Sequence, residues 1–260
     1  MHAITNRIWQ LASLALISTQ LIAVGFGRDH GLITTDDLQG LPLPVKRFLI
    51  YSDIVGTPWI TEVSLEQEGL FKVAPDKDWV PFTATQVFNI EEASFEWKVR
   101  MKMAPLVIVT GRDALQVGQG SMKIKLFGIF PLVNASGPEI DQGSMTRYLS
   151  ESIWFPQVFL DDHISWESID SLSAKAIFTI DDKSVEGVFH FNDLGQVTYF
   201  ECDRYYSEGQ SMELKHWITP VDEYRQLGGL TIGSRGRAIW KQASGDFTYV
   251  DVKINKIVYR

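Results

Sequence analysis

Three side chains in the stretch RYLSESIWFP, residues 147–156, could form a small recognition site. Arg147, Glu151 and Trp154 follow one another at intervals of four and three residues, so on a helix they stack into one ridge. The guanidinium can bind an anionic head group, and the indole can line the apolar part of a ligand. A solvated ion pair or a tight core contact would use the same spacing. Because Trp is seldom placed on a fully wet face, we expect the ridge to be at least partly buried.

Arg204 is a second candidate, because it shares one face of a predicted strand with apolar side chains. In QVTYFECDRYY, alternation places Arg204 on the same side as Phe200, Cys202 and Tyr206. An arginine among apolar neighbours either reaches water along its stem or pairs with a buried acid, for which we expect Glu151. Cys202 is the only cysteine, so no disulfide or CxxC pair can form, and we expect a buried thiol.

The patterns of common catalytic and cofactor sites are missing from the sequence. It has no HExxH, no GxSxG and no phosphate-binding loop, and the glycine-rich stretch 228–236 lacks the lysine that such a loop requires. The triplet DDH at 161–163 has metal-ligating residue types, but it precedes a strand and is more simply a polar turn. We therefore predict no catalytic residue, no metal site and no cofactor, and an enzyme of unknown reaction is the least favoured alternative.

The charge of the chain argues against nucleic acid as a partner. The sequence has 24 Lys and Arg against 32 Asp and Glu, which gives a formal net charge of −8, and no basic run interleaves with aromatic residues. A surface that follows a phosphate backbone needs clustered Lys and Arg, so nucleic-acid binding is not expected.

The elements that must position these residues are mostly β-strands. SFEWKVRMKM, residues 94–103, alternates apolar with charged side chains, which a strand with one wet face explains. Similar runs with short links continue to the C-terminus, and short links force antiparallel neighbours. We predict a mainly β protein with one large curved antiparallel sheet, as a half-barrel, a barrel or a two-layer meander. The lysines of 94–103 would suit an edge strand that avoids edge-to-edge assembly.

Two helices interrupt the strand pattern. A central helix is predicted over 144–156, with Ser144 as its N-cap and Pro156 as its end, and its apolar face can pack on the sheet. A short helix is predicted over 44–52, where Pro44 suits the first turn and apolar residues recur at i, i+3, i+4 and i+7.

The N-terminus carries a targeting signal. Arg7 precedes an uncharged run over residues 8–27, and Ala23 and Gly25 have the small side chains of a secretory cleavage site. The run is also just long enough for a transmembrane helix. We therefore expect the protein to be exported to the periplasm or cell envelope, or to be anchored in a membrane by residues 8–27.

These signals divide the chain into three parts. Residues 1–27 are predicted to be a signal peptide or membrane anchor, residues 28–43 a linker and residues 44–260 a single β-rich domain.

Several short motifs together resemble a bacterial family of unknown function. Its members show an R-Y-L-x-E-x-x-W-F-P box, a downstream W-x-x-x-D, an F-x-x-x-G turn, an Arg ending the next strand, a Trp and a Tyr–Gly pair. The resemblance covers about residues 42–260, and Ile232-Gly233 stands where members often have Ile-Pro. It implies no activity. It marks as candidate ligand-binding residues Arg147, Glu151, Trp154, Trp166, Arg204, Trp217 and Tyr224.

Two functions follow from these expectations. The first is an exported binding protein or carrier for a lipid or another amphipathic or apolar ligand, with helix 144–156 plugging a curved sheet. The second is a structural or protein-interaction domain without a ligand, in which the same Arg, Glu and Trp residues are core scaffolding. A large apolar cavity with an arginine at its mouth would favour the first, and a solid core would favour the second.

Overall fold

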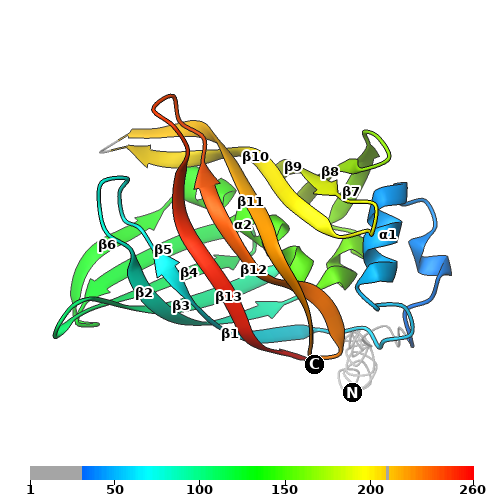
Figure 1. Ribbon diagram of the computed structural model, residues 1–260, viewed down its shortest axis with the longest axis horizontal. Helices are drawn as coiled ribbons and strands as arrows, with labels where there is room; N and C mark the ends of the chain where they lie inside the picture. Colours follow the sequence, from blue (N-terminus) through cyan, green and yellow to red (C-terminus); the bar gives the residue numbers. More distant parts are fainter. Residues whose placement is uncertain (1–30, 209–210) are drawn as a thin grey trace, which may run out of the picture. The chain divides into compact units, whose positions relative to one another are not determined.

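Thirteen strands form one antiparallel sheet in the computed structural model, which describes residues 31–208 and 211–260 (Figure 1). The predicted signal peptide or membrane anchor lies outside the described residues. The strands are β1 (Glu62–Phe71), β2 (Val80–Asn89), β3 (Ser94–Ala104), β4 (Val107–Gln116), β5 (Gln119–Leu126), β6 (Phe130–Ser136), β7 (Ile164–Ser168), β8 (Ser173–Ile180), β9 (Lys183–Phe191), β10 (Val197–Glu208), β11 (Ser211–Leu227), β12 (Leu230–Trp240) and β13 (Phe247–Tyr259).

The sheet is a half-barrel built from two meanders. Its order is β6-β5-β4-β3-β2-β1-β13-β12-β11-β10-β9-β8-β7, so the first and last strands pair at the middle and β6 and β7 are the free edges. A sheet this wide twists and curls, and here it curls around a central helix (Figure 1). The predicted curved antiparallel sheet is thus confirmed, and within the described residues it does not close into a barrel.

Alternation in the sequence appears as alternation of burial. Every second residue of β2 from Val80 to Phe88 is buried on the concave side, and the residues between them are exposed. The predicted strand 94–103 is β3, and it pairs with β2 and β4. The edge-strand interpretation of its lysines is therefore wrong, because β3 lies inside the sheet. The outward lysines need another explanation.

Helix α2 (Pro138–Glu151) crosses the concave face and connects the two edge strands. It starts earlier than the predicted Ser144, which is buried inside the helix. Gly137, with φ of 118°, precedes Pro138 at the first helical turn, and Glu139 and Asp141 follow there, which suits the positive end of the helix. The chain continues through 3-10 helices η2 (Ser152–Trp154) and η3 (Pro156–Leu160).

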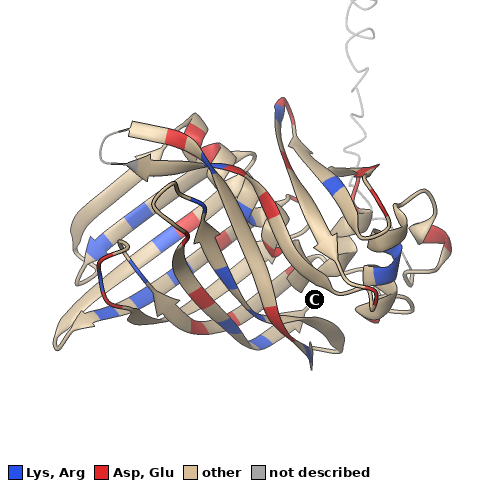
Figure 2. Cartoon of the chain, turned by 45° about the horizontal axis from the view of Figure 1, so that its top comes forward, with Lys and Arg blue, Asp and Glu red and all other residues tan. Residues whose placement is uncertain are grey.

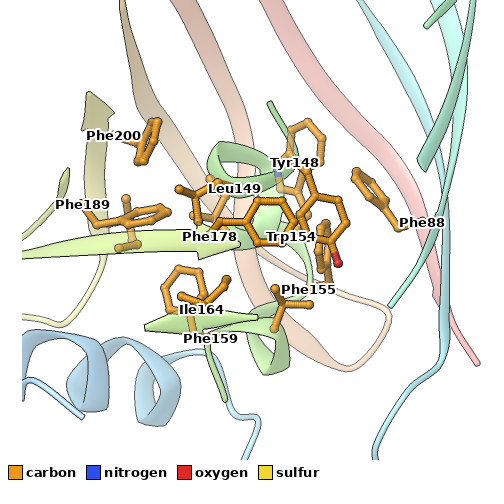
Figure 3. Close-up of a cluster of buried hydrophobic side chains, with 14 of the residues drawn as sticks. Phe88, Tyr148, Leu149, Trp154, Phe155, Phe159, Ile164, Phe178, Phe189 and Phe200 are labelled. Atoms are coloured by element: carbon orange, nitrogen blue, oxygen red, sulfur yellow. The ribbon is translucent and has the colours of Figure 1, made fainter. Parts of the chain in front are cut away.

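The main core lies between α2 and the sheet. Figure 3 shows aromatic side chains from several strands gathered around the helix and the segment after it. Tyr148 stacks on Phe178 of β8 at a centroid distance of 4.9 Å, and Phe88 of β2 contacts Phe155 at 4.3 Å. Two sides of the helix are buried. Leu149 is fully buried in the core on one side, and on the other side Arg147 contacts β4 and Glu151 contacts β2. The central helix is thus packed on the sheet, as predicted.

The segment before the first strand packs on the same core. The predicted short helix is α1 (Leu43–Tyr51), and η1 (Asp36–Leu38) precedes it. Ile33 and Leu38 are buried core residues, so residues from 31 onward belong to the packed domain rather than to a free connection. Of the helices in the described part of the chain, none is long and apolar enough to cross a membrane.

Candidate functional site

A buried ion-pair cluster ties α2 to the concave face of the sheet. Arg147 donates from Nε to Glu151 Oε1 at 2.6 Å and from Nη1 to Asp113 Oδ2 of β4 at 2.8 Å. The three side chains are only 14–17% exposed. Burial alone would lower the pKa of Arg147, but the two carboxylates more than offset this and raise the pKa. This guanidinium is therefore neutralised within the protein.

A chain of amide hydrogen bonds continues from this cluster across the sheet. Gln86 donates to Glu151 Oε2 at 2.7 Å, Gln67 donates to Gln86, and Trp97 Nε1 donates to Gln67 at 2.8 Å. The Arg147 guanidinium also lies 4.6 Å from the ring centroid of Trp97. Burial raises the pKa of Glu151, and Arg147 and Gln86 act in the opposite direction. The network satisfies its buried polar groups, as the low dielectric of a core requires.

Arg204 of β10 has a different environment. Its Nε donates to the carbonyl of Gly143 in α2 at 3.2 Å, and its Nη1 donates to the Tyr249 hydroxyl at 3.3 Å. The guanidinium lies 4.8 Å from the ring centroid of Trp217 and 5.8 Å from that of Trp240. Among the described side chains, no carboxylate forms an ion pair with Arg204. It is a partly buried positive charge in an aromatic setting, with no counter-ion among the described residues.

The expected pairing of Arg204 with Glu151 is therefore wrong. Gly143 and Glu151 are two helical turns apart on α2, which is about 12 Å. The first faces β10 and the second faces β2, so one arginine cannot reach both.

A small cavity lies between the end of α2 and strands β11–β13. Its volume is about 80 Å³, and its apolar lining includes Ile153, Trp154, Val221, Val252 and Ile254. Small-molecule sites usually measure about 300–1,000 Å³, so this cavity is too small for a lipid in its present form. A second hollow, of about 560 Å³, is open and carries polar side chains such as Thr83, Lys98 and Arg100.

The cavity and the Arg204 cluster are neighbours along two strands. Thr219 and Ala238 line the cavity, and Trp217 and Trp240 lie two residues further along the same strands. Two residues of a strand span about 6.6 Å. An apolar space and an uncompensated guanidinium thus lie about one strand repeat apart.

Gly233, which occupies the position where the resembled family often has proline, lies within β12 and not in a loop. It pairs with Tyr224 and lines the cavity, and a Cβ added there would approach Val221 Cγ1 to 2.8 Å. The turn of this hairpin is instead at Gly228 and Gly229, which both have positive φ.

The seven predicted site residues fall into separate groups. Arg147 and Glu151 share the buried cluster, Glu151 and Trp154 line the cavity, and Trp217 stacks on Arg204. Trp166 of β7 instead donates to the Phe159 carbonyl of η3 at 3.1 Å. Tyr224 donates to the Val197 carbonyl at 3.0 Å, and burial raises its pKa.

Some partners were missed from the sequence: Asp113, Gln86, Gln67, Trp97, Tyr249 and Trp240. A signal was present for three of them, because Asp113, Gln67 and Gln86 are polar residues in the inward phase of alternating strands. A polar side chain in that phase indicates a buried partner.

A histidine–carboxylate cluster occupies the outer face. Glu201 of β10 bonds His190 Nε2 at 2.8 Å and His216 Nε2 at 3.1 Å, so the fold does bring these two distant histidines together. Over the described ranges, no group of three or more His, Cys, Asp or Glu side chains has an arrangement that could hold a metal ion. Cys202 is buried, as expected, and burial raises the pKa of its thiol to about 12.

Comparison with known families identifies the family of this chain. A model described as a family of unknown function (DUF6544) matches residues 31–252. The chain belongs to this family. The family match covers all strands of the DUF6544 domain except the last residues of β13. No curated protein matches this DUF6544 member.

Two solved structures resemble the DUF6544 domain at low sequence identity. One is a DUF1329 family protein from Desulfovibrio piger, with a TM-score of 0.48 and 11% identity, covering 84% of this chain and 93% of that chain. The other is a LolA superfamily protein from Nitrosomonas europaea, with a TM-score of 0.45 and 11% identity, covering 84% and 92%.

Proposed function

We propose that this protein is an exported binding protein or carrier for an amphipathic ligand that has an anionic group. The observation that carries the proposal is Arg204, a guanidinium that lies beside two indole rings and next to an apolar cavity and has no counter-ion among the described residues. Keeping a charge partly buried without a counter-ion is costly, so a protein that needed only packing would gain by an apolar residue here. A ligand carboxylate or phosphate would supply the missing charge.

The apolar part of the ligand would enter between η2 and strands β11–β13. The cavity there is about 80 Å³, so Ile153 and Trp154 must move away from β12 to admit an acyl chain. Both residues lie in the short 3-10 helix η2, whose hydrogen-bond geometry is poorer than that of an α-helix. We therefore expect η2 to shift more readily than α2 when a ligand enters.

A second candidate is a structural or interaction domain without a ligand. The tight packing of Trp154, which is 8% exposed, and the small cavity favour it. The two candidates differ in what they require of Arg204. A ligand-free domain has no use for an uncompensated charge at that position.

Native mass spectrometry with lipid extraction tests the proposal on protein purified from its own host. We expect a co-purified anionic amphipath that is lost in Arg204→Met and kept in Arg112→Met. The control arginine lies on β4, pairs with Glu96 and does not line the cavity. A clean apo mass in repeated preparations would favour the ligand-free domain.

Export is part of the proposal and rests on the uncharged run 8–27. N-terminal sequencing of the mature protein tests it. A mature chain that starts near residue 26 supports a cleaved signal peptide, and an intact Met1 in a membrane fraction supports an anchor.

A further inference from the structure

Large apolar side chains are exposed on two neighbouring hairpin tips of the sheet. Leu106, in the turn between β3 and β4, is 88% exposed. The turn between β5 and β6 adds Phe127 and Ile129, which is 72% exposed, and the start of β6 adds the exposed Phe130 and Leu132. The tips are adjacent, because Phe127 N donates to the Ile108 carbonyl at 2.7 Å. We call these five residues the apolar tips.

The backbone at the tips makes these residue types unexpected. Leu106 has φ of 67° and Phe127 has φ of 53°, in the left-handed region that bulky side chains seldom adopt. Phe127 and Gly128 are the central residues of a turn closed by a hydrogen bond from Ile129 N to the Leu126 carbonyl at 3.1 Å. Asn-Gly is the preferred pair for such a turn. Leu and Phe at these positions are thus not explained by the folding of the turns.

The outer face of the same strands is basic. Arg100 and Lys102 of β3 and Lys123 and Lys125 of β5 point outward, and none of them forms an ion pair with a described residue. Figure 2 shows Lys and Arg recurring across these neighbouring strands. The whole chain has a net charge of −8, so this face differs in sign from the protein as a whole. Lys102 on this face is one of the outward lysines of β3 whose presence an edge-strand position does not explain.

We propose that this end of the sheet docks on the surface of an anionic phospholipid bilayer. The apolar tips would enter the boundary between head groups and acyl chains, and the four unpaired basic residues would contact lipid phosphates. Lys102 lies opposite Ile108 and Lys125 opposite Pro131, so the charges begin within a few residues of the tips. The tips protrude from separate turns, which suits a fluid surface better than a shaped protein partner. This docking does not depend on the ligand proposed for Arg204.

Vesicle co-sedimentation of the purified mature protein tests the docking. The protein should bind vesicles of phosphatidylcholine with about one-third phosphatidylglycerol, and it should bind pure phosphatidylcholine more weakly. Leu106→Asn with Phe127→Asn should weaken binding to the anionic vesicles at least about tenfold. Asn is favoured at positive φ, so these variants should fold at least as well as the parent chain.

A matched control exists at the other end of β4. Val117 is 68% exposed and has φ of 48°, but it is a full strand away from the tips. Val117→Asn should leave vesicle binding unchanged. Equal binding by the double tip variant, or no binding of the parent protein to anionic vesicles, would overturn the proposal. Concentration-dependent dimers that the tip substitutions abolish would also overturn it, because the tips would then join copies of the chain.

A local probe separates tip insertion from attachment through residues 8–27. Ile129→Cys offers one exposed thiol, because Cys202 is buried. An environment-sensitive dye on Ile129→Cys should shift to the blue with anionic vesicles, and the same dye on Val117→Cys should not. A shift of equal size at both positions, or at neither, contradicts docking through the tips.

Discussion

Arg147 of α2 and Asp113 of β4 form a buried ion pair, with Nη1 lying 2.8 Å from Oδ2, across the interface between the helix and the sheet. Glu151 completes the cluster from the same helix at 2.6 Å. These contacts fix the depth and rotation of α2 on the concave face. Arg147 and Arg204 therefore differ: Arg147 is paired with two carboxylates, and Arg204 has no carboxylate partner among the described residues.

Replacing Arg147 by methionine should strongly destabilise the domain. Arg147→Met leaves Asp113 and Glu151 buried without a positive partner, and breaking a buried pair from one side costs about 3–5 kcal/mol. Urea unfolding followed by tryptophan fluorescence measures the loss. Arg112→Met, which removes an arginine paired with Glu96 at a more exposed site, should cost less than about 1 kcal/mol.

Removing the two carboxylates together with Arg147 tests the same ion-pair cluster. Arg147→Met combined with Asp113→Leu and Glu151→Leu removes all three charges and should be more stable than Arg147→Met alone. An Arg147→Met protein as stable as the parent would show that the cluster does not hold the helix.

Replacing Arg204 by methionine should leave the stability of the domain nearly unchanged but abolish ligand binding. Arg204→Met removes a charge with no described carboxylate partner and leaves an apolar stem beside Trp217 and Trp240. The substitution loses the hydrogen bonds to Gly143 and Tyr249, but it also removes the cost of burying a charge. These two effects roughly offset each other, so we expect a free energy of unfolding within about 1 kcal/mol of the parent. Urea unfolding beside the ligand assay checks this. A loss as large as that of Arg147→Met would assign Arg204 a purely structural role.

The strands could be predicted because apolar and polar residues alternate in the sequence with the same period of two as burial alternates along a strand. The run 94–103 appears as β3 within a residue, and the short helix 44–52 appears as α1. The start of α2 differs from the prediction, which uses Ser144 as the N-cap. Pro138 with Glu139 and Asp141 after it already carried the signal of a helix start.

The partners of the site residues could not be predicted from local pattern. Asp113 is 34 positions from Arg147, and only the curl of the sheet brings it under the helix. In the same way, Tyr249 reaches Arg204 because β13 returns to pair with β1 and β12. Alternation says which face a residue occupies, and the order of strands decides what it meets there.

Truncating Trp154 should destabilise the domain and enlarge the cavity. Trp154→Ala removes a buried indole from a wall of the cavity of about 80 Å³, and such changes cost about 3–5 kcal/mol. Trp154→Phe, which fills most of the space, should cost less. Urea unfolding measures stability, and an apolar fluorescent dye reports the cavity. Trp154→Ala should bind the dye more tightly than Trp154→Phe, and equal binding would indicate that the core collapses into the space.

The Cys202 thiol should be inert in the folded protein and should contribute to alkaline instability. Burial raises its pKa from 9.0 to about 12, so the folded thiol stays protonated where the unfolded thiol ionises. Between these values the unfolded chain binds fewer protons than the folded one, so the free energy of unfolding falls as the pH rises. Buried tyrosines such as Tyr148 act in the same direction at higher pH, because their ordinary pKa is 10.0.

A thiol-reactive chromophore at pH 8 gives the first readout of Cys202, with no reaction expected until urea unfolds the chain. Urea unfolding between pH 8 and pH 10 gives the second. Cys202→Ala should lessen the fall in stability over this range, because the alanine has no proton to lose. Two outcomes would contradict this expectation: rapid labelling of the native protein, or identical pH profiles for the parent and Cys202→Ala. Either would mean that β10 and β11 separate far more readily than the buried packing of Cys202, Trp217 and Phe200 implies.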